Sequence, residues 1–417
     1  MVKKLVQSDP LVVSVTGPTM KVSLSGIRPD FSSEELLNVA KAALTKYYEE
    51  PHKQTTLEIT NSLDIYRGVL YEAKKLGAQF PSNAWSKYME IYTSIADIIG
   101  KPIIDCKPTD KSYSIFCNAE LPGSSISSIN HFFKTKLPKV TLDWIGSSFK
   151  PDGHGTQLGD TYGFYDHNKT KWLFNEPGFN GDMTDTLVVR DCAKRYLKHQ
   201  PLGCQLYSHD AGLDVTVDQF PWKAYVDQER MNMKLHLGCA IVGLETLRVG
   251  GSFIAKQYIL YEENSKNLIM IYAQFFDDFY LVKPVTSRPY NSESYFVGLG
   301  FKKPKNANEL LSRLYDLHGE PDITMTSLTR AEDRSVISID GLSDIDTMLA
   351  AIDGYMDVSA GRQIRFLNET TQFLERSEKA DTQVYKKFVD TWLKKCRIDK
   401  LDHRDWLPSN SVQQKRY

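Results

Sequence analysis

Short apolar runs alternate with helical segments between about residues 76 and 303, and this alternation limits the fold more than any other feature of the chain. Strands separated by helices form a mostly parallel sheet, because a parallel connection has to cross over a face of the sheet and needs about a dozen residues or more. The runs that fit strands are Tyr113–Asn118, Val140–Ile145, Gln205–His209, Gly251–Lys256, Phe279–Val282 and Ser294–Leu299. We therefore expect an α/β domain over residues 76–303.

Two connections in this region indicate its topology. The segment that starts at Gln228 has apolar residues at helical spacing and stops at Gly250–Gly251, so we expect a crossover helix that leads into the next strand. Only about ten residues separate Phe279–Val282 from Ser294–Leu299, which is too few for a helical crossover. The last strand is therefore expected to run antiparallel to its neighbour.

The flanking regions read mainly as helices. Residues 1–75 begin with a strand-like stretch, Leu11–Val15, and continue with a helix that Ser32 or Ser33 can cap. Residues 304–417 contain two helical patterns, "NANELLSRLYDL" and "DTQVYKKFVDTWLKKC". The second pattern has an apolar stripe that we expect to be core, made of Val384, Tyr385, Phe388, Val389 and Trp392. The chain is thus expected to have a mainly helical N-terminal extension (1–75), an α/β domain (76–303) and a helical C-terminal region (304–417).

The composition excludes several classes of protein. A formal net charge of −1 gives no global sign of nucleic-acid binding, so any RNA surface has to be local. The candidate basic patches, each of which could equally be a solvated face, are Lys134, Lys136 and Lys139; Arg190, Lys194, Arg195 and Lys198; and Lys302, Lys303 and Lys305. The cysteines lack zinc-ligand spacing and are expected to be reduced thiols, with no metal required. No signal peptide pattern and no stretch of about 18 apolar residues are present, so we expect a cytoplasmic protein that spans no membrane.

Two turn-rich segments could approach a small ligand. In "CNAELPGSSIS" a strand is followed by a turn with Glu120, Pro122 and Gly123, and a glycine at the carboxyl end of a strand lets backbone come close to a ligand. The same pattern also fits an ordinary strand–turn–helix corner. In "GFNGDMTD" the carboxylate of Asp182 follows Gly181 and can accept a hydrogen bond from an adenine amine or close an Asx turn.

Four ionisable residues stand at positions where reaction chemistry would need them. Asp210 and Lys256 each follow a buried apolar strand, and a charge at such a place needs a partner or a function. A structural salt bridge between them would satisfy this need, and so would an active site. Glu293 precedes the last strand, and Lys87 lies on a helix ahead of the sheet.

These segments together resemble the successive motifs of FtsJ-like (RrmJ-like) ribose 2′-O-methyltransferases. The resemblance covers about residues 80–303 and rests on "SNAWSKYMEI", "ELPG", "NGDMTD", "SHDAG", "GGSFIAKQY" and "SRPYNSESYFVG", which occur in the order of the family. In motif detail the chain is most similar to the cap methyltransferases of large cytoplasmic DNA viruses such as African swine fever virus. It departs from the family at Ser124, where a second glycine is more usual, and in the long gap from Lys87 to Asp210, which implies inserted loops within about 150–200.

The resemblance implies a class I (Rossmann-like) sheet with one late antiparallel strand, S-adenosyl-L-methionine (AdoMet) as cofactor, and an RNA substrate. It implies a catalytic tetrad of Lys87, Asp210, Lys256 and Glu293. The residues that it places beside AdoMet are Glu120, Pro122, Gly123, Ser124, Gly181 and Asp182, with Asp182 toward adenine.

The chemistry expected of such a site is the attack of a ribose 2′-oxygen on the sulfonium methyl group. Lys256 is the candidate base, and it must be neutral to accept a proton. Burial and nearby positive charges lower its pKa, whereas Asp210 and Glu293 raise it, and the sequence does not give the sign of the sum. Lys87 would hold the ribose or a phosphate.

Three functions remain open at this stage. The first is methylation of the messenger RNA cap (cap-1 type), and the second is methylation of an internal ribosomal or transfer RNA ribose. An aromatic pair that holds a methylated guanine would distinguish them, but Tyr162, Tyr165 and Trp172 fit packing equally well. The third is an inactive scaffold domain in a capping or virion complex, against which the complete tetrad argues. For a viral protein, the expected location is the host cytoplasm or the virion.

Overall fold

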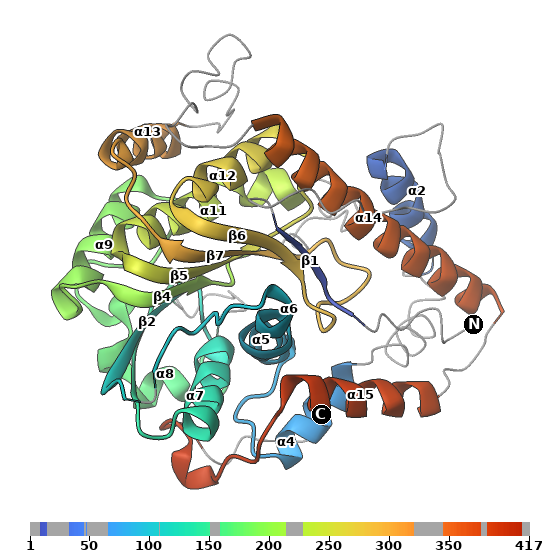
Figure 1. Ribbon diagram of the computed structural model, residues 1–417, viewed down its shortest axis with the longest axis horizontal. Helices are drawn as coiled ribbons and strands as arrows, with labels where there is room; N and C mark the ends of the chain where they lie inside the picture. The colour runs from blue at the N-terminus through green and yellow to red at the C-terminus, as the bar shows by residue number, and fades with distance from the viewer. Residues whose placement is uncertain are drawn as a thin grey trace.

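A seven-stranded sheet lies at the centre of the computed structural model, with the strand order β1-β6-β7-β5-β4-β2-β3 (Figure 1). The structure describes residues 9–14, 33–45, 47, 66–107, 109–150, 159–213, 228–320, 345–376 and 382–410. The strands are β1 (Leu11–Ser14), β2 (Ser112–Asn118), β3 (Thr141–Gly146), β4 (Cys204–His209), β5 (Leu247–Gln257), β6 (Phe276–Lys283) and β7 (Ser294–Phe301). All six strands expected for the α/β domain are therefore confirmed.

The directions of the strands confirm the expected topology and extend it. β2, β3, β4 and β5 are parallel, and β7 lies antiparallel between β5 and β6. A second antiparallel strand, β1, pairs with β6 at the edge of the sheet, in the register Leu11↔Lys283. The sequence indicated this strand but not its place, because the pairing joins segments far apart in the chain. Through β1, the N-terminal extension covers an edge that would otherwise present unpaired backbone groups.

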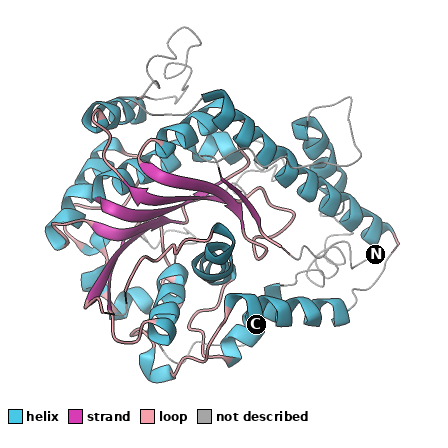
Figure 2. Cartoon of the chain, viewed as in Figure 1, coloured by secondary structure: helices cyan, strands magenta, loops and turns pink. Residues whose placement is uncertain are grey.

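Helices cover both faces of the sheet (Figure 2). One face is covered by α9 (Thr186–His199), α11 (Gln228–Thr246) and α12 (Glu263–Ala273). The other is covered by α5 (Asn83–Glu90), which continues through η2 (Ile91–Ile95) and α6 (Ala96–Ile99), and by α7 (Ser124–Lys136). The expected crossover helix is α11, which connects β4 to β5 and buries most of its residues from Asn232 onward.

The flanking helices pack on one another and on this core. They are α2 (Ser33–Thr45), α4 (Tyr66–Lys75), α13 (Ala307–Gly319), α14 (Ile345–Glu375) and α15 (Thr382–Cys396). Leu37 and Leu44 of α2 cluster with Leu367 and Leu374 of α14. The predicted stripe of α15 is core at Phe388, Val389 and Trp392, which cluster with α4, whereas the side chains of Val384 and Tyr385 lie outside the described residues. The three-part division of the chain stays a prediction.

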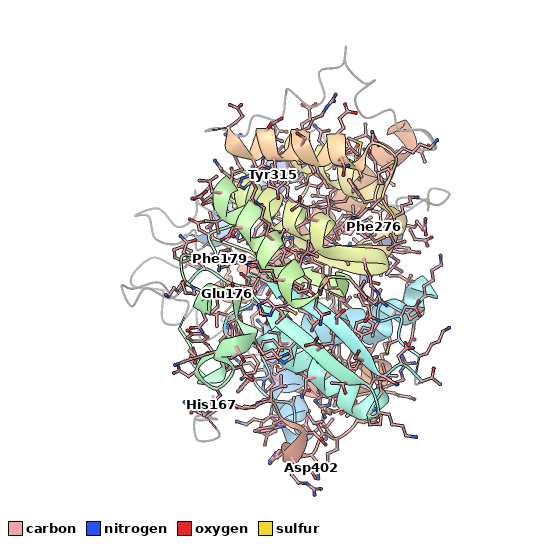
Figure 3. The ribbon with its side chains drawn as sticks, turned by 90° about the vertical axis from the view of Figure 1, so that its left-hand side faces the viewer. His167, Glu176, Phe179, Phe276, Tyr315 and Asp402 are labelled. Atoms are coloured by element: carbon pink, nitrogen blue, oxygen red, sulfur yellow. The ribbon has the colours of Figure 1, made fainter. Side chains whose placement is uncertain are left out.

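The last described segment, residues 397–410, runs back along the domain. Leu401 N donates to Leu76 O (2.8 Å), and Asn410 N donates to Tyr162 O (3.0 Å). It includes η8 (His403–Asp405) and reaches α8 (Phe164–His167), so that His167 and Asp402 lie at the same end of the molecule (Figure 3). The helices η3 (Lys169–Lys171) and η4 (Leu173–Asn175) follow α8, in the region where inserted loops were expected; residues 151–158 of that region lie outside the described ones.

Candidate active site

The sheet register places three of the four predicted catalytic residues side by side. His209 of β4 pairs with Ala255 of β5, so the next residues along, Asp210 and Lys256, are neighbours. Lys256 in turn pairs with Tyr295 of β7, which lies two residues after Glu293. Because β7 runs antiparallel to β5, its first residues lie at the same edge of the sheet as the last residues of β4 and β5. The parallel strands thus place these groups at their carboxyl edge, where open α/β sheets bind ligands.

The fourth residue, Lys87, reaches this edge from helix α5. Ser82 caps the helix by accepting a hydrogen bond from Trp85 N (3.2 Å). One turn later, Lys87 is only 6% exposed, and its ammonium group forms an ion pair and hydrogen bond with Glu293 Oε1. The predicted convergence of the four side chains at one edge is confirmed, whereas their catalytic roles stay predictions.

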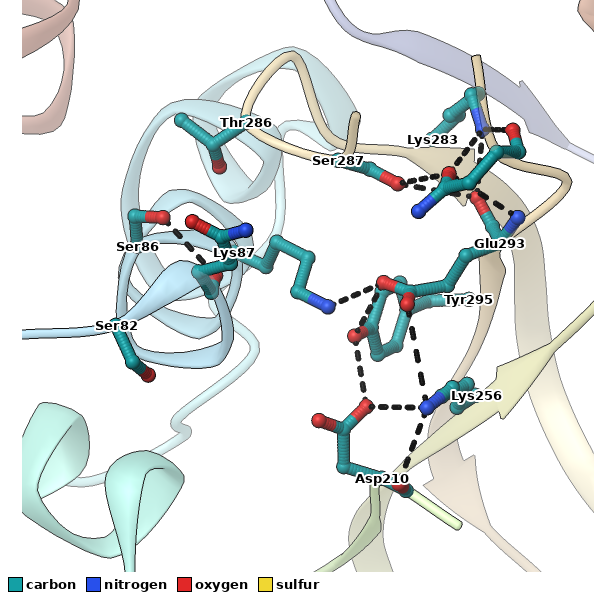
Figure 4. A network of polar contacts seen from close by, with 12 residues as sticks. Ser82, Ser86, Lys87, Asp210, Lys256, Lys283, Thr286, Ser287, Glu293 and Tyr295 are labelled. Carbon is teal, nitrogen blue, oxygen red and sulfur yellow. Dashed lines mark hydrogen bonds and ion pairs between the residues drawn. The ribbon is translucent and has the colours of Figure 1, made fainter. Parts of the chain in front are cut away.

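The four groups form one polar network (Figure 4). Lys256 Nζ lies 3.6 Å from Asp210 Oδ1 and 3.9 Å from Glu293 Oε2, and it donates to the backbone oxygen of Asp210 at 3.3 Å. The hydroxyl of Tyr295 lies 2.9 Å from Asp210 Oδ1 and 3.0 Å from Glu293 Oε1, so its single proton can serve either carboxylate. Gly212 leaves space for two side chains, because a Cβ at this position would lie 2.6 Å from the Tyr258 hydroxyl and 3.0 Å from Lys256 Nζ.

The electrostatics of the network fix the charge of its two central groups. Burial alone would lower the pKa of Lys256, but the acidic groups around it, led by Asp210, raise that pKa above the usual value of 10.5. Burial alone would raise the pKa of Glu293, but the ammonium groups of Lys87 and Lys256 hold it well below the usual range. Lys256 is therefore a cation and Glu293 an anion at neutral pH, because among the protein's own groups the acids outweigh burial in setting the pKa of Lys256.

The turn predicted to contact the cofactor follows β2. Glu120 is buried and accepts from Ser125 N (2.7 Å), from the Ser125 hydroxyl and from Ile126 N (3.4 Å), so its carboxylate caps α7. Gly123 has a φ of 104°, and a Cβ there would lie 2.3 Å from the ring of Phe164. The contacts of Glu120 and Gly123 are thus structural, and Pro122 and Ser124 complete the same turn into α7. Their contact with a cofactor stays a prediction.

The second predicted cofactor segment lies beside the end of β3. A Cβ on Gly181 would lie 1.8 Å from Ser148 O, so the two loops are in direct contact. Ser147 O also accepts from Glu120 N (3.1 Å), which connects this place to the turn after β2. Asp182 Oδ1 accepts from Thr184 N (2.9 Å) and from its hydroxyl (2.7 Å). Asp182 therefore closes a turn, and its contact with adenine stays a prediction.

Five of the ten residues in the candidate RNA patches have acidic or aromatic partners among the described residues, namely Lys134, Lys136, Arg190, Arg195 and Lys302. Lys136 pairs with Asp399 (2.6 Å), and Arg195 pairs with Glu176 (2.7 Å). Lys302, Lys303 and Lys305 follow the end of β7, which lies at the edge of the sheet opposite Glu293. This last patch is therefore far from the tetrad, and its contact with RNA stays a prediction.

The aromatic residues considered for a cap site pack within the protein. Tyr162 stacks directly on Phe80, with 4.3 Å between ring centroids and 14° between planes. Trp172 is buried against Gly146. The hydroxyl of Tyr165 donates to Asn175 Oδ1 (2.9 Å). None of the three forms, with another described aromatic residue, a pair of parallel rings far enough apart for a guanine to enter between them.

Three residues of the site did not stand out in the sequence. Tyr295 has the period-two spacing from Glu293 that places both on one face of a strand, and this signal could have identified it. Glu90 lies one helical turn after Lys87 and is 1% exposed. Lys283 is buried at the end of β6, where burial lowers its pKa to about 7. Singly, each is an unremarkable residue of a helix or strand, and only their contacts reveal them.

A parallel sheet with β7 inserted antiparallel between β5 and β6, and with a polar site at its carboxyl edge, defines a class I (Rossmann-like) methyltransferase fold. Among the described residues, no group of His, Cys, Asp and Glu side chains could hold a metal ion, and no helix is long and apolar enough to cross a membrane.

Comparison with known proteins gives the family. Residues 175–301 match the family model of the FtsJ-like methyltransferases. The African swine fever virus protein described as "Probable methyltransferase EP424R" (isolate Warthog/Namibia/Wart80/1980) is 34% identical over 304 residues, which cover 70% of this chain and 67% of the viral protein. The cap-specific mRNA (nucleoside-2′-O-)-methyltransferase 2 of Danio rerio is 28% identical over 254 residues, which cover 60% of this chain and 32% of that protein. The corresponding protein of Mus musculus is 27% identical over 289 residues, covering 67% and 34%. The chain belongs to the FtsJ-like methyltransferase family.

A methyltransferase of this family implies AdoMet as the methyl donor, and the charges at the site fit this cofactor. Asp210 is near enough to Glu120 to raise its pKa further, beyond the effect of burial, to a value of about 8. A cation bound beside these two carboxyl groups would relieve the repulsion between them. AdoMet is cationic at both its sulfonium and its amino group.

Proposed function

We propose that this protein is an AdoMet-dependent RNA ribose 2′-O-methyltransferase that acts on the 5′ cap of messenger RNA. The observation that carries the proposal is the network of Lys87, Asp210, Lys256 and Glu293 at the carboxyl edge of the sheet, in a member of the FtsJ-like family. The cap, rather than an internal ribose, is supported by the relatives described as cap-specific mRNA methyltransferases. Because the chain spans only about a third of those proteins, the cap is part of the proposal.

The residues of the network have distinct tasks in this reaction. Bound AdoMet supplies an electrophilic methyl group. Lys256, whose ammonium group lies near both Asp210 and Glu293, binds the ribose 2′-oxygen and aligns it for attack. Asp210 orients the lysine through the contacts at 3.6 Å and 3.3 Å. Lys87 binds a ribose oxygen or the neighbouring phosphate, and Glu293 holds Lys87 by their ion pair.

The positive charge of Lys256 restricts how the proton of the ribose 2′-hydroxyl can be removed. The carboxylates keep its pKa above the usual value, so the lysine first acts as a hydrogen-bond donor to the 2′-oxygen. It can accept the hydroxyl proton only after it has released one of its own to water, and a cation placed beside it favours that release. Alignment by itself can supply roughly 7–11 kcal/mol of barrier lowering, so a lysine that orients the hydroxyl is essential in either protonation state.

The cofactor is proposed to bind along the ends of β2 and β3, beside Glu120, Pro122, Gly123, Ser124, Gly181 and Asp182. The contact of Gly181 with Ser148 and the hydrogen bond from Glu120 to Ser147 support this, because they join both predicted segments into one surface. Asp210 at the end of β4 then lies between this surface and Lys256 of β5.

Methyl transfer from labelled AdoMet to defined RNAs tests the proposal. The substrates are one RNA with an N7-methylguanosine cap, the same RNA with a 5′ triphosphate, and capped RNAs with a 2′-deoxy sugar at the first or the second nucleotide. We expect label in the capped RNA, loss of label with one of the deoxy substitutions, and little label in the triphosphate RNA. Equal transfer to internal positions of both RNAs would replace the cap with an internal target. AdoMet binding without transfer to any RNA would favour an inactive scaffold.

A further inference from the structure

The loop between β6 and β7 delivers Glu293 to the tetrad, and buried side chains from three other elements hold its backbone. This loop, residues 284–293, is called the β6–β7 loop below. At its start, Glu90 of α5 accepts from Val285 N (2.7 Å) and Thr286 N (3.1 Å). The two backbone groups are thereby tied to the helix that carries Lys87.

The end of the loop is held from β6. Lys283 Nζ donates to Asn291 O (2.8 Å) and to Glu293 O (2.8 Å). The amine of Lys283 thus binds the backbone on both sides of Ser292. These two anchors lie within the predicted methyltransferase domain.

The third anchor comes from the C-terminal region. Gln363 of α14 is 1% exposed, and its side-chain amide donates to Tyr290 O at 2.7 Å. The oxygen and the nitrogen of the same amide each lie 3.5 Å from the hydroxyl of Ser292, the residue directly before Glu293. One turn further along α14, Phe366 packs against the ring of Tyr290, with 6.0 Å between centroids. Helix α14 therefore holds the loop immediately before the residue that binds Lys87.

We propose that Gln363 is a positioning residue for Glu293, so that helix α14 belongs to the catalytic unit. This inference rests on the proposed function. Glu293 has to hold its carboxylate between Lys87 and Lys256. Its backbone is held directly by Lys283, and Gln363 holds the loop one and three residues earlier. Displacement of a reacting geometry by about 1 Å can cost roughly 100-fold in rate, even when the change lies outside the chemistry.

The test compares Gln363→Met with the wild type and with Asn368→Ala. Methionine keeps the length of the side chain and removes the amide, and Asn368 is an exposed residue of the same helix. For Gln363→Met we expect kcat to fall roughly 10- to 100-fold. Hydrogen exchange of the β6–β7 loop should become faster and AdoMet affinity should stay unchanged. Asn368→Ala should match the wild type in all three measurements. If Gln363→Met does not fold, Gln363→Asn keeps the amide but ends one methylene short of Tyr290, and it should show the same losses.

A double-mutant cycle with Glu293→Gln separates positioning from general stability. If Gln363 acts through Glu293, Gln363→Met should lower kcat by less than about twofold in the Glu293→Gln protein, because the group that it positions is already changed. Equal losses in both backgrounds would make Gln363 a structural residue and overturn the inference.

These measurements distinguish a failure of the inference about Gln363 from a failure of the proposed function. A wild type that methylates RNA, together with a Gln363→Met variant of unchanged kcat and loop exchange, would overturn the inference alone. A wild type that methylates no RNA would overturn both, since Glu293 would then have no reaction to serve.

Discussion

Lys87 and Glu293 form a buried ion pair, although 206 positions separate them in the chain. The pair joins helix α5 to the β6–β7 loop, and Glu90, one turn after Lys87, binds the start of the same loop. Two carboxylates therefore connect the same two elements: Glu293 through its ion pair with Lys87, and Glu90 through its hydrogen bonds to the loop. The position of Lys87 over the sheet depends on both.

The first prediction concerns Lys256. Lys256→Met keeps the apolar stem of the side chain and removes the charge. We expect methyl transfer to capped RNA to fall by at least about 100-fold, because the lost interaction acts in the transition state. AdoMet and RNA affinities should change little. Lys302→Met, at the opposite edge of the sheet, is the matched control and should retain the wild-type rate. A Lys256→Met protein with nearly wild-type kcat would exclude the proposed mechanism.

The second prediction separates the two roles open to Asp182. Asp182→Ala should weaken AdoMet binding roughly tenfold, the loss of about one hydrogen bond, in isothermal titration. Thr184→Val removes one of the hydrogen bonds that close the turn but leaves the carboxylate in place. It should bind AdoMet as the wild type does. Equal weakening by both substitutions would assign Asp182 to the turn and not to adenine.

The third prediction uses the raised pKa of Glu120. The folded protein keeps the proton of this carboxyl group up to about pH 8, whereas the unfolded chain releases it near pH 4.5. Between these values the folded state binds more protons, so the contribution of Glu120 to stability falls as the pH rises. Glu120→Gln removes this contribution. We expect the free energy of unfolding of the variant, measured by urea denaturation from pH 5 to pH 8, to fall less steeply than that of the wild type. Parallel curves would contradict the shift.

The fourth prediction concerns Glu90. Its carboxylate also accepts from the hydroxyl of Thr286 (2.8 Å) and from Trp392 Nε1 (3.2 Å). Glu90→Ala leaves four buried donors without this acceptor and should destabilise the fold by roughly 3–5 kcal/mol. Trp392→Phe removes a single donor and should cost about 1–2 kcal/mol. Chemical denaturation measures both values. Equal effects of the two substitutions would show that the packing of α15, and not the carboxylate, dominates.

Local patterns were sufficient to predict most secondary structure. Apolar runs bounded by turn residues identified the strands β2 to β7, and helical spacing identified α2, α11, α13 and α15. These features depend on residues that are close together in the chain, so a local sequence pattern is enough to predict them. The pairing of β1 with β6 depends on a contact between distant segments, and the sequence did not contain it. The packing of the long helix α14 against α2 and against the β6–β7 loop also depends on contacts between distant segments, and the sequence did not indicate it.

The sequence by itself also determined the composition of the site. The order of the motifs, through the resemblance to the FtsJ-like family, identified Lys87, Asp210, Lys256 and Glu293. Sheet geometry accounts for the neighbouring positions of Asp210 and Lys256, which follow the ends of parallel strands. Only the tertiary structure decided that Lys256 is charged, that Tyr295 bridges the two carboxylates, and that Gln363 of a distant helix holds the loop of Glu293. The physical reason is that the pKa of a buried group and the partner of a buried amide depend on distances and burial, which exist only once the chain is folded.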